Sequence, residues 1–315
     1  MIAARQSIDT ETKVEGRRRR RRSPEPAAWI GWAFLAPNLA GFAIFTFFPL
    51  LFSLFIAFTS WDVISGLDGI KWVGIDNFTS LSKTGEFWHS GGRTLFYAGV
   101  SVPITTAFGL MIALALNGPI PARALLRLIF FIPFIANSVA IASTWILLYD
   151  PRYGPINRML SSLGVDNPPV WLASSKWALT SLIIMAIWQG AGFAAVIYMA
   201  ALQDVPEDLH EAAALDGAGT WERFKVITFP FLTPTSFFLL ITGFIGASQS
   251  FGMINLMTQG GPGSSTTVLS YYVYVNAFRF YKFGYASAVA WVMFLFILVL
   301  TMLLWRVQRR GVFYG

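Results

Sequence analysis

Charged residues occur in short stretches of this 315-residue sequence, and long apolar intervals separate them. A helix needs about 20 apolar residues to cross the ~30 Å hydrocarbon core of a bilayer. Intervals of this kind predict about six membrane-spanning helices, within residues 27–59, 94–116, 128–149, 177–202, 229–257 and 284–305. We therefore expect an all-α integral membrane fold.

Glycine and proline modify this pattern. No charged residue occurs between Lys225 and Arg279, yet residues 260–263 read Gly-Gly-Pro-Gly and predict a polar loop after the fifth helix. A proline inside a helix removes one backbone hydrogen bond and favours a kink. We expect kinks at the prolines within the intervals, which are Pro37, Pro49, Pro103, Pro133 and Pro234.

Composition excludes an ordinary soluble domain. The chain is 55% hydrophobic and only 12% charged, about half the charged share of a soluble protein, so it lacks a charged shell for a core of that size. Its net charge of +7 comes mostly from Arg17 to Arg22. Such a run can bind nucleic acid, but beside a spanning helix it more commonly holds the N-terminus in the cytoplasm near anionic lipid. We expect residues 1–26 to be a disordered basic tail and expect no nucleic-acid partner.

The positive residues also predict an orientation. An even number of spans puts both termini on one side, and that side carries 15 of the 23 lysine and arginine residues. Without Arg17 to Arg22 the two sides hold nine and eight lysine and arginine residues, so the N-terminal tail supplies most of the difference in positive charge. We expect both termini to be cytoplasmic, residues 27–305 to form the transmembrane domain, and residues 306–315 to form a short cytoplasmic C-terminus.

Residues that carry chemistry are scarce. The chain has no cysteine and only two histidines, His89 and His210, both between the apolar intervals. We therefore expect no catalytic residue, no metal site and no cofactor in this chain. It also has no Gly-x-x-x-x-Gly-Lys-Ser/Thr sequence that would cradle nucleotide phosphates. The six intervals contain no Asp, Glu, Lys, Arg or His, which disfavours an ion-coupled carrier. A self-contained carrier or channel for a small polar solute stays open as the alternative.

Residues 204–230, between the fourth and fifth intervals, are the most informative segment. They hold six acidic residues, and a short helix is predicted from Pro206 until Gly217 and Gly219 end it. Small side chains share one face of that helix, at Ala212 and Ala213. An interfacial helix lying on lipid favours basic and large apolar residues, so this face better suits docking of another protein.

The same segment carries a spaced motif. Glu211-Ala212-Ala213 is followed after three residues by Gly217, after nine more by Ile227, and then by Phe229 and Pro230. This motif resembles the conserved loop of the membrane permeases of bacterial and archaeal ATP-binding-cassette (ABC) importers, with Phe229 in place of the usual leucine. Residues 73–78, 216–218 and 258–262 are further similar to the sugar-importer branch, of the maltose or glycerol-3-phosphate first-subunit type.

The resemblance implies a type I ABC importer permease in the bacterial or archaeal cytoplasmic membrane. Such a subunit pairs with a second permease, receives solute from an extracytoplasmic solute-binding protein, and alternates access when two ABC ATPase subunits bind ATP. ATP and magnesium would then belong to the partner ATPase. The resemblance implies that the loop forms a coupling helix, with ATPase-coupling residues Glu211, Ala212, Ala213, Asp216, Gly217, Ile227 and Pro230.

A second group of residues is a candidate for the solute path. Polar and aromatic side chains in the fourth and fifth intervals suit sugar hydroxyls and sugar faces, although they would serve equally as interhelical hydrogen bonds. They do not choose between an oligosaccharide, a polyol and glycerol 3-phosphate. The candidate pathway residues are Trp188, Gln189, Ser248, Gln249, Phe251 and Asn255.

Overall fold

The computed structural model describes residues 28–118 and 120–311, so the predicted disordered tail, residues 1–26, lies outside the described residues. The chain divides into two units, residues 1–51 and 52–315. The first unit contains α1 (Ala28–Phe42), a π-helical segment η1 (Ala43–Phe47) and the start of α2 (Phe48–Ile56). Between residues 28 and 311, residue 119 apart, only two isolated β-bridges occur and no strand forms, which confirms the all-α prediction.

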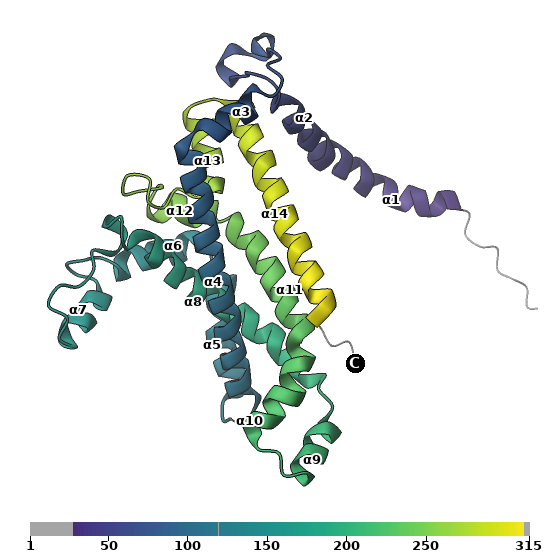
Figure 1. The fold of residues 1–315 in the computed structure, drawn as a ribbon, viewed down its shortest axis with the longest axis vertical. Coiled ribbons are helices and arrows are strands. Elements are labelled where there is room, and N and C mark those ends of the chain that lie inside the picture. The colour runs from purple at the N-terminus through teal and green to yellow at the C-terminus, as the bar shows by residue number, and fades with distance from the viewer. Residues whose placement is uncertain (1–27, 119, 312–315) are drawn as a thin grey trace, which may run out of the picture. The chain divides into compact units, whose positions relative to one another are not determined.

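The second unit holds the remaining helices (Figure 1). Its 3-10 turns are η2 (Val63–Ser65), η3 (Leu67–Gly69) and η4 (Trp171–Ala173), and its π-helical segments are η5 (Phe224–Thr228) and η6 (Val275–Arg279). Its α-helices are α3 (Asp76–Lys83), α4 (Gly85–Asn117), α5 (Arg123–Ile135), α6 (Ser138–Leu148), α7 (Pro155–Ser162), α8 (Ala178–Gln203), α9 (Glu207–Leu215), α10 (Thr220–Arg223), α11 (Phe229–Ser248), α12 (Phe251–Met257), α13 (Leu269–Tyr274) and α14 (Phe283–Gly311).

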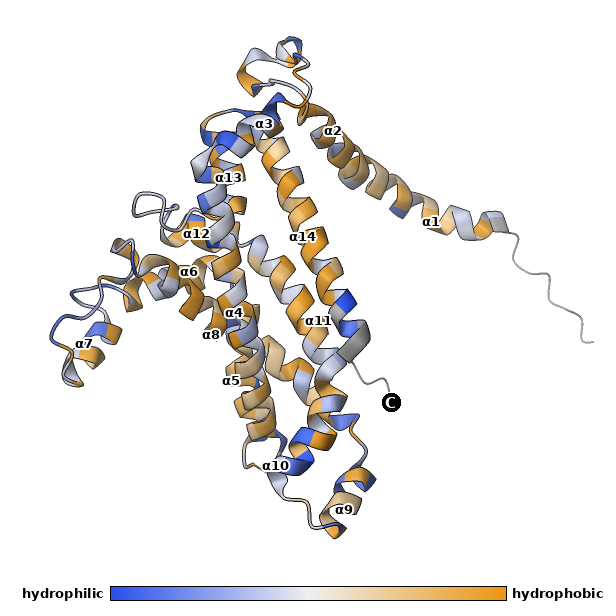
Figure 2. Ribbon diagram, in the orientation of Figure 1, coloured by the Kyte–Doolittle hydropathy of each residue, from blue (hydrophilic) through white to orange (hydrophobic). Residues whose placement is uncertain are grey.

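Five helical segments among the described residues are long and apolar enough to cross a membrane, and a bent pair, α5 with α6, makes a sixth. This agrees with the predicted number of spans. Apolar residues cover most of α11 and α14, whereas hydrophilic residues gather at α9 and α10 (Figure 2). The five segments are Trp29–Ile56, Gly85–Asn117, Ala178–Gln203, Thr220–Ser248 and Phe283–Arg306.

Helix α4 begins nine residues before the predicted interval 94–116, whose start was set by the charged Arg93. Arg93 Nη1 donates to Glu86 Oε1 at 2.7 Å, and its Nη2 donates to Ser264 Oγ at 3.2 Å. The seven-residue spacing puts the two charges on one helix face, where they neutralise each other. The predicted membrane-spanning interval has its edge at Arg93, but the helix extends beyond it to Gly85.

The third interval is two helices and not one. Helices α5 and α6 meet at an angle of 98°. Pro133 removes a backbone hydrogen bond near the end of α5, and Asn137 starts a new helix by accepting a hydrogen bond from Val139 N at 2.8 Å. Proline followed by an asparagine cap explains why an uncharged run bends here.

The predicted fifth helix, residues 229–257, is also broken. Helix α11 ends at Ser248, and α12 begins at Phe251. Between them the Phe251 N–H bonds to the Gln249 carbonyl at 2.7 Å, in a tight turn. Glycines and serines surround this break and have weak helix propensity, which an analysis based on charge alone cannot detect.

The core of the second unit forms where α4, α8 and α11 pack together. Gly109 of α4 lies so close to Ala194 of α8 that a Cβ on the glycine would overlap the alanine methyl group. Small residues at such contacts let membrane helices approach closely. The α9–α10 loop and the α3–α13 region lie at opposite ends of this packed bundle (Figure 1).

Candidate functional site

The segment 204–230 forms a projecting loop between α8 and α11. Helix α9 has no buried residue, and the exposed fractions of Leu215 and Trp221 are 89% and 73%. Large apolar side chains at such exposure on a polar loop favour contact with another protein. The loop continues directly into the membrane helix, because α10, η5 and α11 form one helical segment, Thr220–Ser248.

Gly217 fixes the end of α9. Its φ of +84° lies in the left-handed region, where an L side chain is strained. Its N–H bonds to the Ala214 carbonyl at 3.1 Å, and the Ala218 N–H bonds to the Ala213 carbonyl at 2.9 Å. These two bonds form a Schellman motif, so the glycine of the predicted motif has a clear structural reason to be a glycine.

Four of the seven predicted coupling residues line one hollow. Ala213, Asp216 and Gly217 contribute its α9 side, and Ile227 contributes its η5 side. The hollow has a volume of about 290 Å³ and also contains the charged residues Glu222 and Arg223. Glu211 and Ala212 are exposed on α9, while Pro230 is partly buried in the first turn of α11 and lies outside the hollow.

A second site is a central cavity of about 430 Å³ among α4, α5, α8, α11 and α12. Its lining is apolar with several hydroxyl groups, and none of its described lining residues is charged. The polar and aromatic residues in the lining are Tyr97, Ser101, Thr105, Thr106, Phe134, Gln189, Phe193, Thr242 and Ser250.

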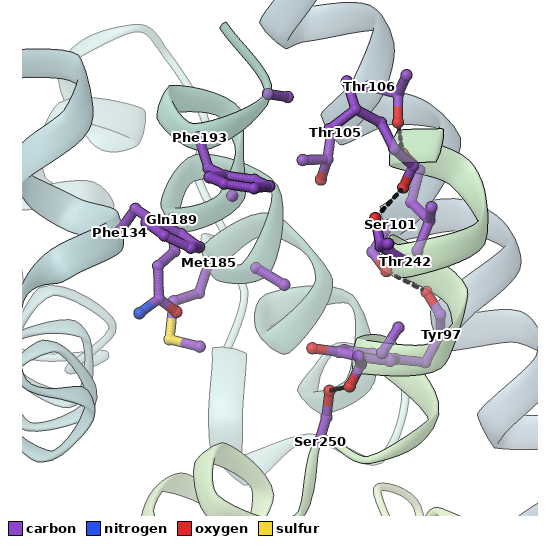
Figure 3. Close-up of a pocket in the computed structure, with 18 of the residues that line it drawn as sticks. Tyr97, Ser101, Thr105, Thr106, Phe134, Met185, Gln189, Phe193, Thr242 and Ser250 are labelled. Atoms are coloured by element: carbon purple, nitrogen blue, oxygen red, sulfur yellow. Dashed lines mark hydrogen bonds between the residues drawn. The ribbon is translucent and has the colours of Figure 1, made fainter. Parts of the chain in front are cut away.

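The cavity presents hydrogen-bond acceptors (Figure 3). The hydroxyls of Ser101, Thr106 and Thr242 donate to carbonyls of their own helices at 2.6, 2.9 and 2.7 Å. Each oxygen keeps lone pairs for a ligand hydroxyl. Gln189 lies on the side of the cavity opposite Ser101 and makes no hydrogen bond with the described residues, so its amide is available both to donate and to accept.

Of the six predicted pathway residues, only Gln189 lines this cavity. Ser248 is buried and donates to the Phe244 carbonyl at 2.8 Å. Phe251 packs against Tyr271 and Tyr274, and Trp188 packs edge-on against Trp145.

The two remaining pathway residues also lie outside the cavity lining. Gln249 occupies the break between α11 and α12, and Asn255 lies within α12. The prediction treated the fifth interval as one continuous helix, so the break at Gln249 changes which side chains share a face.

Sequence reasoning missed the hydroxyl row on α4. Tyr97, Ser101 and Thr105 recur every four residues and therefore share one helix face. That spacing was visible in the sequence. Thr242 comes from α11, and only the packing of the helices shows that it faces the same cavity.

The fold, the projecting loop and the central cavity define a membrane permease. Residues 105–313 match the family described as "Binding-protein-dependent transport system inner membrane component", and the chain belongs to this family. It has the fold of a type I ABC importer permease: it superimposes on a bacterial ABC transporter that imports the acidic polysaccharide alginate with a TM-score of 0.78, at 26% identity, over 90% of this chain and 96% of that one.

Three curated relatives are similar over most of their length. The chain is 36% identical to the probable ABC transporter permease YesP of Bacillus subtilis, over 90% of this chain and 92% of that protein. It is 35% identical to the trehalose/maltose permease MalF of Thermococcus litoralis, over 90% and 94%. It is 33% identical to the lactose permease LacF of Rhizobium radiobacter, over 87% and 92%.

Proposed function

We propose that this permease moves a sugar or related polyol across the cytoplasmic membrane by alternating access, driven by separate ATPase subunits that dock on the 204–230 loop. One observation supports this most strongly: the loop connects two helices that wall the central cavity. Gln189 and Phe193 of α8 line the cavity ahead of the loop, and Leu239 and Thr242 of α11 line it after the loop. A rigid-body displacement of the loop would therefore move the cavity walls.

The lining chemistry supports a neutral polyhydroxylated solute. Hydroxyl oxygens accept hydrogen bonds from solute hydroxyls, and the apolar and aromatic surfaces of Phe134 and Phe193 suit the C–H faces of a sugar ring. Uncharged lining residues offer no counter-ion for a phosphate. Relatives named for trehalose/maltose and lactose transport are consistent with this class.

The proposed assembly contains further chains. A second permease would complete the path, and two ABC ATPases would bind ATP and magnesium. An extracytoplasmic solute-binding protein would deliver the solute, as in the related alginate transporter solved in complex with its sugar-bound periplasmic protein. Membrane lipid would surround the apolar helices. Both termini and the coupling loop would be cytoplasmic, and this chain would contribute no catalytic group.

Uptake with a blocked cavity tests the proposal. Thr242→Trp places an indole in the cavity, whereas Leu295→Trp places the same side chain on α14 at a position that is 52% exposed and does not line the cavity. Trehalose, maltose and lactose uptake would be measured in membranes of matched permease content. We expect Thr242→Trp to abolish uptake and Leu295→Trp to retain it. Equal uptake by both variants would contradict a path through the cavity.

A further inference from the structure

A separate, polar pocket is lined in part by residues of α3 and α13. Figure 1 shows these two helices at the end of the bundle opposite the 204–230 loop. This outer pocket has a volume of about 520 Å³, within the usual range of small-molecule sites. It shares no lining residue with the central cavity. Its lining residues are Ser60, Trp61, Asp62, Asn77, Ser80, Thr84, Tyr272, Asn276, Lys282 and Tyr285.

The polar groups of the outer pocket are held in place. Asn77 Nδ2 donates to the carbonyls of Ala57 and Thr59 at 2.8 and 2.9 Å. Both amide hydrogens are thereby used, and no donor from the described residues reaches its Oδ1, which remains an acceptor. Asn276 is 5% exposed, and its Nδ2 donates to the Tyr272 carbonyl at 2.9 Å. Fixed amides of this kind need little reorganisation to bind a ligand.

The pocket also offers free hydroxyls and opposite charges. The Ser60 and Ser80 hydroxyls make no hydrogen bond with the described residues, and Lys282 has no carboxylate of the described chain within 4 Å. Asp62 accepts hydrogen bonds from Ser65 N and Oγ, both at 2.8 Å. These two hydrogen bonds lower the pKa of Asp62 below its ordinary value, with the larger effect from the Ser65 side chain and the smaller from its main-chain N–H. The carboxylate is therefore ionised at neutral pH.

Aromatic rings complete the pocket. Tyr272 and Tyr285 are joined through their hydroxyls at 3.0 Å. Trp61 is braced by its Nε1, which donates to the Gly66 carbonyl at 2.8 Å, and by edge contact with Phe52. Rigid aromatic surface beside amide oxygens, hydroxyls and one charge of each sign matches a sugar ring, which has apolar C–H faces and many hydroxyl groups that both donate and accept.

We propose that the outer pocket is a carbohydrate subsite separate from the central cavity, holding one or two sugar rings at the outer end of the permease. The inference rests on the proposed solute class. Because the two sites have no lining residue in common, each can be disturbed without the other.

The absence of cysteine from the chain makes the test direct, because one introduced thiol is the only maleimide target. Ser80→Cys places it in the pocket, and Ser82→Cys places it on the same helix outside the lining. Thr242→Cys reports the central cavity. The full-length chain in lipid nanodiscs would be labelled with a maleimide in the presence of trehalose, maltose or lactose. A parallel sample would contain proline at equal osmolality instead of the sugar.

We expect at least one sugar to slow labelling of Ser80→Cys about tenfold at roughly ten times its half-protecting concentration, with Ser82→Cys and the proline samples unchanged. If no sugar protects Ser80→Cys while Thr242→Cys is protected, the subsite is overturned and the solute path stands. If neither is protected, both proposals fail. If only a sugar-free solute-binding protein protects Ser80→Cys, the pocket is a binding site for that protein and the subsite is again overturned.

Discussion

Tyr198 of α8 donates a hydrogen bond to Ser236 Oγ of α11 at 2.8 Å, which joins the two helices that carry the projecting loop. Ser236 passes the bond on to the Leu232 carbonyl of its own helix at 2.9 Å. Tyr198 is almost fully buried. This hydrogen bond therefore links the helix that precedes the 204–230 loop to the helix that follows it.

Loss of this hydrogen bond should be measurable as stability. We expect Tyr198→Phe to lower the free energy of unfolding by about 1 kcal/mol, the usual contribution of one buried hydrogen bond. Denaturant titration in micelles measures it, and Tyr153→Phe, at a position that is 73% exposed, is the matched control. A double-mutant cycle with Ser236→Ala should give a coupling of roughly 0.6 kcal/mol, typical of membrane helices. A coupling free energy near zero would show that this hydrogen bond does not stabilise the contact between α8 and α11.

The contact between Gly192 of α8 and Phe130 of α5 has no room for a side chain. A Cβ on Gly192 would overlap the Phe130 carbonyl oxygen, which is main chain and cannot rotate away. We expect Gly192→Ala to cost about 1–3 kcal/mol of unfolding free energy because the helices must separate.

Gly99→Ala is the control for that substitution. Apart from the nearby backbone of α4 itself, no atom lies within 4 Å of a Cβ built at Gly99. Alanine there should therefore be neutral or stabilise the helix by up to about 1 kcal/mol. Thermal unfolding of the two variants in the same detergent compares them. Equal unfolding midpoints would show that α5 and α8 are not in the described contact.

The cluster of Arg93, Glu86 and Ser264 should restrict the motion of the loop that contains Gly260, Gly261 and Pro262. Arg93 bonds to Glu86 and Ser264, and Ser264 Oγ in turn donates to Glu86 Oε2 at 3.3 Å. We expect Arg93→Gln to increase amide exchange in residues 258–268, since the link between α4 and this loop is weakened. Lys71→Gln, an exposed residue outside the cluster, should leave that exchange unchanged. Exchange measured by mass spectrometry decides, and unchanged exchange in Arg93→Gln would contradict the restraint.

Gly217 and Gly219 make a matched pair in the coupling loop. Gly217 has φ +84°, whereas Gly219 has φ −68°, and space is open at both. Gly217→Ala should destabilise the end of α9 by about 1–2 kcal/mol, the cost of a left-handed conformation. Faster hydrogen exchange of the backbone amides of residue 217 and Ala218 would show this destabilisation, while Gly219→Ala should leave both amides protected. Equal protection in the two variants would remove the structural reason for glycine at 217.

The sequence predicted the number of membrane-spanning segments and their helical type, because a bilayer requires each span to be a long uncharged helix. It predicted a kink at Pro133, but not that a new helix starts after Asn137, and it did not predict the break at Gln249, where weak helix formers interrupt the apolar run. It did predict the end of α9 at Gly217, because the left-handed backbone angle that ends a helix favours glycine.

The cavity was harder to predict. Gln189, one of the six predicted pathway residues, lines the cavity, but the hydroxyl row on α4 was overlooked. A helical face becomes a cavity wall only when neighbouring helices leave it uncovered. That depends on how α4, α8 and α11 pack together, and a single sequence does not contain this information.

The most direct test of the account is whether the 204–230 loop binds an ATPase. The chain would be expressed with candidate ABC ATPase subunits and purified from membranes, as wild type, as Glu211→Lys on the exposed α9, and as Asp166→Lys, an exposed acidic residue outside the loop. The account predicts that wild type and Asp166→Lys retain the ATPase and that Glu211→Lys loses it at equal membrane content. Retention by Glu211→Lys as complete as by wild type, or no retention by wild type with any candidate, would contradict it.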